Sequence, residues 1–269
     1  MTERTLITST HNPMAQSWRN LIRSRQARLE QGQFVAEGEH MVTEAIRSGR
    51  VSELIVAEDS LGRYGGLVAK AEAMACPVYL VSKHLLEAVA DTRTPQGVFC
   101  VCSMPETARM PYVSMIAALE NVQDPGNVGT VMRTMDAVGC AGVLLSRTCA
   151  DAFSPKTLRA SMGAVFRVPV WVADDFASAL QLLKRREYLL LAGVLDGQDF
   201  YERPADPDRV CLLIGNEGQG LTPETAAMAD LRVRLPMEGG AESLNAAVAG
   251  AIMAYDVLRR RREHAAASL

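Results

Sequence analysis

Residues 231–256 have the sequence LRVRLPMEGGAESLNAAVAGAIMAYD and combine an apolar strand, a glycine loop and a polar helix start. The apolar run ends at Pro236, and a loop with Gly239 and Gly240 follows it. Residues 242–245 then open a helix rich in alanine and glycine. Since both the loop and the first turn of the helix offer backbone N–H groups, this order predicts a small-molecule pocket.

The size and composition of the chain favour a globular protein with two domains. Its 269 residues are 48% apolar and 22% charged, which is enough for two separate cores. A net charge of −3 argues against a generally basic nucleic-acid-binding surface but leaves room for a local basic patch. Before Glu30 the sequence contains one acid, Glu3, and five arginines: Arg4, Arg19, Arg23, Arg25 and Arg28. Each of these arginines has two equally open roles: it lies on a solvated helix face, or it contacts RNA.

The cysteines and the apolar runs argue against several classes of protein. Six cysteines are scattered without a C-x-x-C pair, and the four histidines lie far apart, so we expect no metal site. Buried, reduced thiols in a cytoplasmic protein are the simplest interpretation. Residues 1–10 lack the apolar segment of a secretory signal, and the longest apolar run, residues 246–254, is too short to span a bilayer. We therefore expect a cytoplasmic protein without a membrane partner.

The first hundred residues predict a small α/β domain. An arginine-rich helix lies within residues 1–30, with Leu21, Ile22 and Leu29 on its inner face. Short apolar strands then alternate with helices as far as residue 102. Two prolines, Pro105 and Pro111, mark the boundary of this domain.

The rest of the chain predicts a parallel sheet that is buried on both faces. Helices separate uninterrupted apolar strands at residues 113–119, 142–145, 188–194 and 210–214. The functional loops of such a sheet lie at the carboxyl ends of its strands. We therefore expect an α/β protein with domains at residues 1–105 and 112–269.

Three polar loops follow strands of this second domain. The first, residues 120–129, leads into a helix with Arg133; the second, residues 215–221, holds Glu217; the third holds Ser243 and Asn245. Each loop has an ordinary structural interpretation, such as helix capping by Asn127 or a plain turn. The second loop has neither the dinucleotide fingerprint nor the Lys-Ser/Thr pair of a P-loop. Together, the three loops predict one pocket.

These loops resemble the three motifs of the SpoU (TrmH-type) family of RNA ribose 2′-O-methyltransferases in the SPOUT superfamily. The matching residues are 121–134, 213–221, and 235–237 with 243–245, and the resemblance covers roughly residues 112–260. Residues 34–38 and 94–97 resemble the accessory RNA-binding domain of the family, which is similar to some ribosomal proteins. The sequence Ala246-Ala247-Val248 departs from the Val-Ser-Val or Val-Ala-Val of the family, at positions that pack a helix.

The resemblance implies a knotted domain that binds S-adenosylmethionine. Relatives of this type have a parallel sheet with a deep trefoil knot, which is an exception to the rule that folds avoid knots. By motif position, the residues implied to contact the cofactor are Gly215, Gly220, Leu235, Met237 and Leu244. The family also implies a homodimer through the knotted domain, with the helix from Leu244 in the interface.

The same resemblance implies the catalytic residues, which are Asn127, Arg133, Glu217, Ser243 and Asn245. The family treats the position of Arg133 as the group that activates the ribose hydroxyl. Because a guanidinium essentially never loses its proton, we expect Arg133 to hold the adjacent phosphate and stabilise the nascent alkoxide instead. Ser243 and Asn245 would orient the nucleophile and Arg133. Two roles are open for Glu217: fixing the second loop or fixing Arg133.

The expected activity is 2′-O-methylation of a ribose in structured RNA. The separate N-terminal domain favours rRNA over tRNA, and phosphate contacts are expected from Arg19, Arg23, Arg25 and Arg28. The competing class is an RNA-binding homologue that is catalytically silent, against which the intact polar motif positions argue. A small-molecule nucleotide enzyme would leave the arginine-rich N-terminus without a role. Nothing in the loops selects a particular nucleotide.

Overall fold

A computed structural model describes residues 6–139 and 141–267, and their contacts divide the chain into two compact units. Unit 1 extends to Pro105 and also contains Phe153–Arg167. Unit 2 consists of Glu106–Ala152 and the chain from Val168 onward. The domains expected from the sequence placed residues 153–167 with the second domain, whereas their contacts place them in unit 1.

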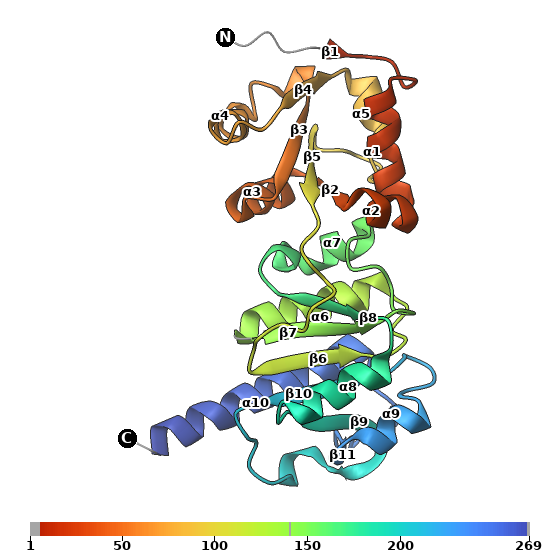
Figure 1. Ribbon diagram of the computed structural model, residues 1–269, viewed down its shortest axis with the longest axis vertical. Helices are drawn as coiled ribbons and strands as arrows, with labels where there is room; N and C mark the ends of the chain where they lie inside the picture. The colour runs from red at the N-terminus through yellow and green to blue at the C-terminus, as the bar shows by residue number, and fades with distance from the viewer. Residues whose placement is uncertain (1–5, 140, 268–269) are drawn as a thin grey trace. The chain divides into compact units, whose positions relative to one another are not determined.

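Unit 1 is built on a five-stranded sheet with the order β1-β4-β3-β5-β2 (Figure 1). β5 is antiparallel to both β2 and β3, whereas β4 is parallel to β1 and β3. The elements are β1 (Leu6–Ile7), α1 (Pro13–Arg23), α2 (Arg25–Gln31), β2 (Gln33–Glu37), α3 (Glu39–Ser48), β3 (Val51–Ala57), η1 (Glu58–Ser60), α4 (Gly65–Ala73), β4 (Val78–Val81), α5 (Lys83–Val89) and β5 (Val98–Ser103). This alternation confirms the α/β character expected for the first part of the chain.

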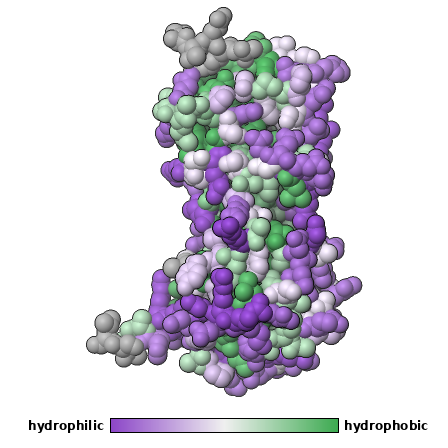
Figure 2. All heavy atoms as spheres, in the orientation of Figure 1, coloured by the Kyte–Doolittle hydropathy of each residue, from purple (hydrophilic) through white to green (hydrophobic). Residues whose placement is uncertain are grey.

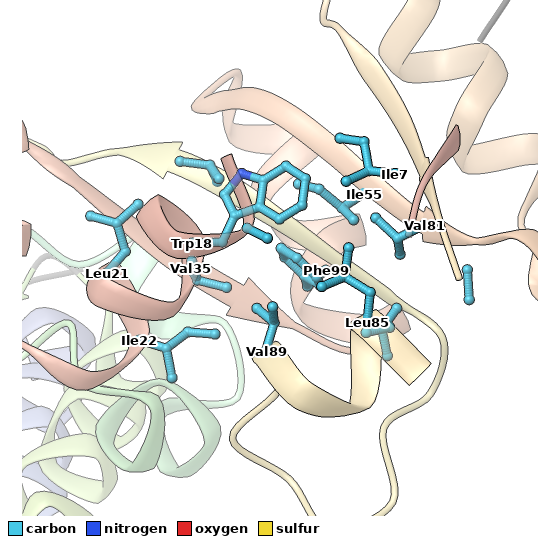
Figure 3. Close-up of a cluster of buried hydrophobic side chains, with 14 residues drawn as sticks. Ile7, Trp18, Leu21, Ile22, Val35, Ile55, Val81, Leu85, Val89 and Phe99 are labelled. Atoms are coloured by element: carbon cyan, nitrogen blue, oxygen red, sulfur yellow. The ribbon is translucent and has the colours of Figure 1, made fainter. Parts of the chain in front are cut away.

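The core of unit 1 forms around Trp18 (Figure 3). The indole packs edge-on against Phe99, with 5.6 Å between ring centroids, and its Nε1 donates a hydrogen bond of 2.7 Å to Glu53. Ile55 and Leu85 come from the sheet and from α5 to the same cluster. Burial of these apolar groups is the main stabilising contribution to the unit.

Three expectations for the N-terminal helix are wrong. The chain forms two helices, because Ser24 is extended and its side chain caps α2. Leu29 is 55% exposed rather than on an inner face. Arg28 is only 4% exposed and donates from Nη1 to the carbonyls of Leu21 and Ile22, at 2.6 and 3.1 Å. It satisfies carbonyls at the end of α1 that lack helical partners, so it does not offer its charge to RNA.

The segment Phe153–Arg167 contributes α7 (Pro155–Ser161) and η2 (Ala164–Phe166) to unit 1. Phe34 on β2 lies between Phe153 and Phe166, with ring centroids 5.0 and 5.8 Å away. Arg159 of the segment also pairs with Asp91 at 2.7 Å. Apolar burial and an ion pair therefore join these residues to a sheet that lies far upstream in the sequence.

Unit 2 has a six-stranded sheet with the order β11-β9-β10-β6-β7-β8, and every pair is parallel. Its elements are β6 (Met115–Leu119), α6 (Pro125–Val138), β7 (Ala141–Ser146), β8 (Val170–Ala173), α8 (Phe176–Arg185), β9 (Leu189–Asp199), η3 (Phe200–Glu202), β10 (Val210–Ile214), α9 (Pro223–Met228), β11 (Leu231–Arg234) and α10 (Ala246–Ala267). α8 packs on one face of the sheet, and α6 and α10 pack together on the other (Figure 1). The expected parallel sheet is confirmed.

α10 begins at Ala246 rather than within residues 242–245 as expected, because Asn245 caps it. Gly250 allows the helix to approach the sheet, since a Cβ there would lie 2.7 Å from the Cδ1 of Ile214. Near its end, Asp256 is buried among arginines: it accepts from Arg203 at 2.7 Å and from Arg259 at 2.8 Å. The basic run at residues 259–262 therefore contributes internal contacts as well as charge.

The cysteines that the structure describes are all buried, and none of them forms a disulfide: Cys76, Cys100, Cys102, Cys149 and Cys211. Burial raises the pKa of the Cys76 thiol to about 11. Cys140 lies outside the described residues. Within residues 6–139 and 141–267, no helix is long and apolar enough to cross a membrane. Hydrophilic and apolar residues are interspersed on the face shown in Figure 2.

Candidate functional site

The three polar loops follow β6, β10 and β11, whose carboxyl ends lie at the same edge of the parallel sheet of unit 2. A chain of hydrogen bonds joins them. Asn127 donates from Nδ2 to Oε1 of Glu217 at 2.7 Å, and its Oδ1 accepts from Nδ2 of Asn245 at 3.0 Å. Oδ1 of Asn245 in turn accepts from the backbone N–H groups of Ala247 and Val248. Each loop therefore contributes one residue to this series of hydrogen bonds, and the series ends at the backbone of the first turn of α10.

Asn127 is free for this role because it is not the N-cap of its helix. Asp124 is the N-cap of α6, and its side chain accepts from the N–H of Gly126 at 2.5 Å. The capping interpretation of Asn127 is therefore wrong. Asn127 is the third residue of α6, in its first turn, and its amide projects toward the second and third loops.

A second set of contacts joins the first loop to the second. Asn216 donates from Nδ2 to the carbonyl of Asn121 at 2.8 Å, while its Oδ1 accepts from the N–H groups of Gly218 and Gln219. Asn121 has a φ of 56°, a left-handed conformation that asparagine tolerates better than most residues. Its N–H donates to Oγ of Ser146 at 3.0 Å. The backbone of both loops is thus held in one arrangement.

Sequence reasoning missed Glu120 as an anchor of the second loop. This residue is 6% exposed, and its carboxylate accepts from the N–H and Oγ1 of Thr222 at 2.8 and 2.9 Å. Oγ1 of Thr225 also donates to it, at 2.6 Å. The sequence held a signal for this role, because Glu120 directly follows a buried strand. A carboxylate buried there needs several hydrogen-bond donors, which a neighbouring loop can supply.

The second loop closes so tightly that Gly215 cannot be replaced without movement. A Cβ on Gly215 would lie 2.1 Å from the carbonyl carbon of Gly220 and 2.2 Å from the nitrogen of Leu221. Asn216 and Gly220 exchange backbone hydrogen bonds of 3.0 and 2.9 Å, and Gly220 has a φ of 70°. The two glycines therefore bring backbone atoms close to any ligand bound at this loop.

A cavity of about 630 Å³ lies beside the second and third loops. Its walls include all five residues expected to contact the cofactor: Gly215, Gly220, Leu235, Met237 and Leu244. Glu217 and Ser243 also line it. Ligand pockets for small molecules commonly have volumes of a few hundred to a thousand Å³ and mainly apolar walls with a few polar groups. A nucleoside with an attached side chain suits this cavity in size and character.

The other expected catalytic residues do not line the cavity. Asn127 and Asn245 lie in the hydrogen-bonded chain beside it. Arg133 is exposed on α6, and no hydrogen bond or ion pair to it occurs within the described part of the chain. Its guanidinium therefore keeps its donors available on the same helix that carries Asn127.

No metal site accompanies the cavity in residues 6–139 and 141–267, where no group of three or more His, Cys, Asp or Glu side chains could hold an ion. The polar groups of the site are amides, a hydroxyl, carboxylates and guanidinium groups. Such groups can orient a nucleophile and stabilise developing charge.

Comparison with known families decides to which group this arrangement belongs. Residues 114–255, more than half of the chain, match the model of the SpoU rRNA Methylase family. The chain belongs to the SpoU rRNA methylase family. Residues 12–100 match an MRM3-like substrate binding domain. The family predicted from the three motifs is thereby confirmed.

Relatives of this SpoU chain match it across both units. The 23S rRNA (guanosine(2553)-2′-O)-methyltransferase RlmP of Bacillus subtilis (strain 168) is 34% identical over 93% of this chain and 97% of its own. The crystal structure of an AdoMet-bound rRNA methyltransferase from Sinorhizobium meliloti is 31% identical, with a TM-score of 0.84 over 95% of this chain and 97% of its own.

The SpoU methyltransferase AviRb from Streptomyces viridochromogenes, solved in complex with the cofactor AdoMet, is 26% identical to this chain. Its TM-score is 0.82 over 93% of this chain and 98% of its own. These likenesses confirm the expected fold class and show that similar SpoU enzymes bind AdoMet.

Proposed function

We propose that this protein transfers a methyl group from S-adenosylmethionine to a ribose 2′-hydroxyl in rRNA. The observation that carries the proposal is the hydrogen-bonded chain Glu217–Asn127–Asn245, which joins the three motif loops beside a cavity of nucleoside size. The two relatives from Bacillus subtilis and Sinorhizobium meliloti, matched across both units, are named rRNA methyltransferases. A cytoplasmic location is part of the proposal, because the relatives from Bacillus subtilis and Sinorhizobium meliloti are bacterial and bacterial rRNA lies in the cytoplasm.

The cavity fits S-adenosylmethionine. The backbone at Gly215 and Gly220 offers close polar contacts for an adenine, and Leu235, Met237 and Leu244 supply apolar walls. When bound, the cofactor supplies an electrophilic methyl group on a positively charged sulfur. A water-poor cavity favours the transfer, because positive and negative charge neutralise each other in its transition state.

The residues of the chain have to orient the ribose hydroxyl and stabilise it as it loses its proton. Arg133 stays protonated, so its donors hold the neighbouring phosphate and the developing alkoxide. Ser243 lines the cavity and can orient the hydroxyl. The side-chain amides of Asn127 and Asn245 form hydrogen bonds with each other, with Glu217 and with the backbone of α10, so these two residues position the loops. This supports the loop-fixing role for Glu217.

Three further features of the protein belong to the proposal. Arg19, Arg23 and Arg25 of unit 1 contact RNA phosphates. A homodimer forms through unit 2, which is supported by exposed apolar residues one and three turns into α10, Val248 at 47% and Tyr255 at 51%. The sheet of unit 2 contains the trefoil knot expected of the family.

The test is methyl transfer by purified protein, measured with radiolabelled S-adenosylmethionine and rRNA from a strain that lacks it. Arg133→Ala should abolish transfer while calorimetry shows nearly unchanged cofactor affinity. Arg185→Ala removes another exposed arginine, on α8, and serves as the matched control. Full activity of Arg133→Ala would refute the assignment. Transfer to tRNA instead of rRNA would establish the alternative substrate, and absent cofactor binding would indicate a silent homologue.

A further inference from the structure

A second cavity in unit 2 lies at the edge of the sheet opposite the three motif loops. It has a volume of about 560 Å³, and its walls include Tyr112, Glu187, Asp208 and Arg209. These residues precede β6, β9 and β10, which run parallel, so the amino ends of the three strands meet here. A strand of five residues separates the two edges by about 15 Å. The two cavities share no wall residue, so a ligand of the second one lies apart from methyl transfer.

Tyr112 presents an exposed aromatic ring on a backbone that is held in place. The residue is 86% exposed. The hydroxyl of Tyr188 donates a hydrogen bond to the carbonyl of Val113. The carbonyl of Ser114 accepts from the N–H of Val210 at 3.0 Å. The ring is therefore preorganised for a partner, and a planar nucleobase suits it because every base can stack on an aromatic side chain.

Arg209 lies against this ring. Its guanidinium carbon is 5.7 Å from the centre of the Tyr112 ring, and its Nη2 donates to the Tyr112 hydroxyl at 3.4 Å. Its Nη1 donates to the carbonyl of Arg186 at 2.8 Å, which fixes the guanidinium beside the ring. Since arginine has five N–H donors, the fixed group can also donate to a base that stacks on Tyr112.

Glu187 supplies a carboxylate at a backbone position that disfavours glutamate. It follows the end of α8 with a φ of 63°, the left-handed conformation in which glycine or asparagine usually ends a helix. Its side chain is 90% exposed and lies 4.0 Å from Nη1 of Arg209. A non-glycine residue in this conformation is strained, and such strain commonly accompanies a functional role.

A carboxylate close to a guanidinium matches the edges of a guanine base. Guanine has two adjacent donors, N1–H and the N2 amino group, which the two oxygens of a carboxylate accept as a pair. It also has two adjacent acceptors, O6 and N7, which a guanidinium fits. Adenine and cytosine have one amino group beside acceptors, and uracil has one N–H group. None of these three bases satisfies both side chains in the same way.

We infer that this cavity binds an unpaired guanine of the RNA, stacked on Tyr112 with its donors on Glu187 and its acceptors on Arg209. The inference rests on the proposed function for the presence of RNA. The motif loops contain nothing that selects a nucleotide, whereas this cavity can select one. Because it lies at the other edge of the sheet, the guanine belongs to a different nucleotide from the one whose ribose is methylated.

The test is fluorescence anisotropy on the full chain with two labelled single-stranded RNA heptamers, in which six uridines surround a central guanosine or a central adenosine. The unmodified protein should bind the guanosine heptamer about tenfold more tightly, as expected for one paired set of hydrogen bonds to a base. Tyr112→Ala should weaken that heptamer about tenfold through the lost stack, whereas Tyr112→Phe should retain its affinity. Tyr201→Ala removes another exposed tyrosine of unit 2 and should change neither affinity.

Glu187 is tested by two variants that separate binding from stability. Glu187→Gln removes the paired acceptor, so the two heptamers should bind equally. Glu187→Gly should abolish the preference as well, yet its urea midpoint should not fall, because glycine adopts the left-handed conformation without strain. A lower midpoint with a retained preference would show a merely structural role and overturn the inference.

Three further outcomes would also overturn it: equal affinities of the unmodified protein for the two heptamers, unchanged affinity in Tyr112→Ala, or competition by saturating S-adenosylhomocysteine. Guanosine monophosphate that binds as tightly as the guanosine heptamer would make the free nucleotide the ligand and overturn the assignment to RNA. A protein that selects guanosine but binds no S-adenosylmethionine would support this inference and contradict the proposed function.

Discussion

Replacing Glu120 with alanine should loosen the second loop and lower the free energy of unfolding. The substitution removes the acceptor for three hydrogen bonds of 2.6–2.9 Å from Thr222 and Thr225. Thr225 is 3% exposed, so its hydroxyl cannot turn to water. The N–H of Thr222 and this hydroxyl are left without acceptors at about 1–3 kcal/mol each, which gives a loss of about 2–6 kcal/mol.

Glu120→Gln is the graded version of the same change. Its amide retains one oxygen for two of the bonds but presents an NH₂ group to the third donor, so we expect a loss of about 1–3 kcal/mol. Both variants are measured by urea unfolding, in which a lower midpoint with an unchanged slope reports stability alone. Glu87→Ala, an exposed acid on α5, should stay within about 0.5 kcal/mol of the unmodified protein. If Glu120→Ala unfolds like this control, the anchoring role is refuted.

The remaining predictions concern four other positions. Burial alone would raise the pKa of Asp256, but hydrogen bonds from two arginines outweigh burial and lower the pKa. The ionised Asp256 therefore stabilises the fold at a pH above its unfolded pKa of about 3.9. This stabilisation disappears as the pH falls through the lower pKa of the folded state. Urea midpoints measured from pH 6 down to pH 3 should fall less steeply in Asp256→Asn. Gly215→Ala should lower the free energy of unfolding by about 1–3 kcal/mol through overpacking, and it should weaken cofactor binding in calorimetry. A variant that binds the cofactor with unchanged affinity would contradict the close backbone approach at Gly215. Arg28→Ala should destabilise the protein by about 2–3 kcal/mol without changing the salt dependence of RNA binding, while Arg23→Ala should lower the salt slope by about 1 at constant stability.

The loops could be predicted to converge, because uninterrupted apolar strands imply a parallel sheet and parallel strands end at one edge. The five residues expected to contact the cofactor line one cavity for the same reason. The roles of single polar residues were harder to foresee. An arginine in a basic run looks the same whether it meets solvent or, like Arg28, a pair of buried carbonyls. Asn127 looked like an N-cap, but Asp124 takes that role.

Other features depend on register, which local patterns do not specify. β9 contains a bulge at residues 193–197, because β11 pairs with two separated parts of this strand. The segment Phe153–Arg167 joins unit 1 because Phe34 accommodates its two phenylalanines, and nothing near the segment in the sequence indicates that partner.

The sequence by itself determined the α/β class, the parallel sheet, the three motif loops and the family. The class, the sheet and the loops follow from apolar periodicity and from residue types at short spacing, and the family follows from the resemblance of the three loops to its motifs. Only the tertiary structure decided which polar atoms meet: Asn127 reaches Glu217 across 90 residues and Asn245 across 118. It also decided that Asp196 stands opposite Arg232 on the cavity wall. The physical reason is that local pattern sets which residues are buried, whereas strand order and register set which of them become neighbours.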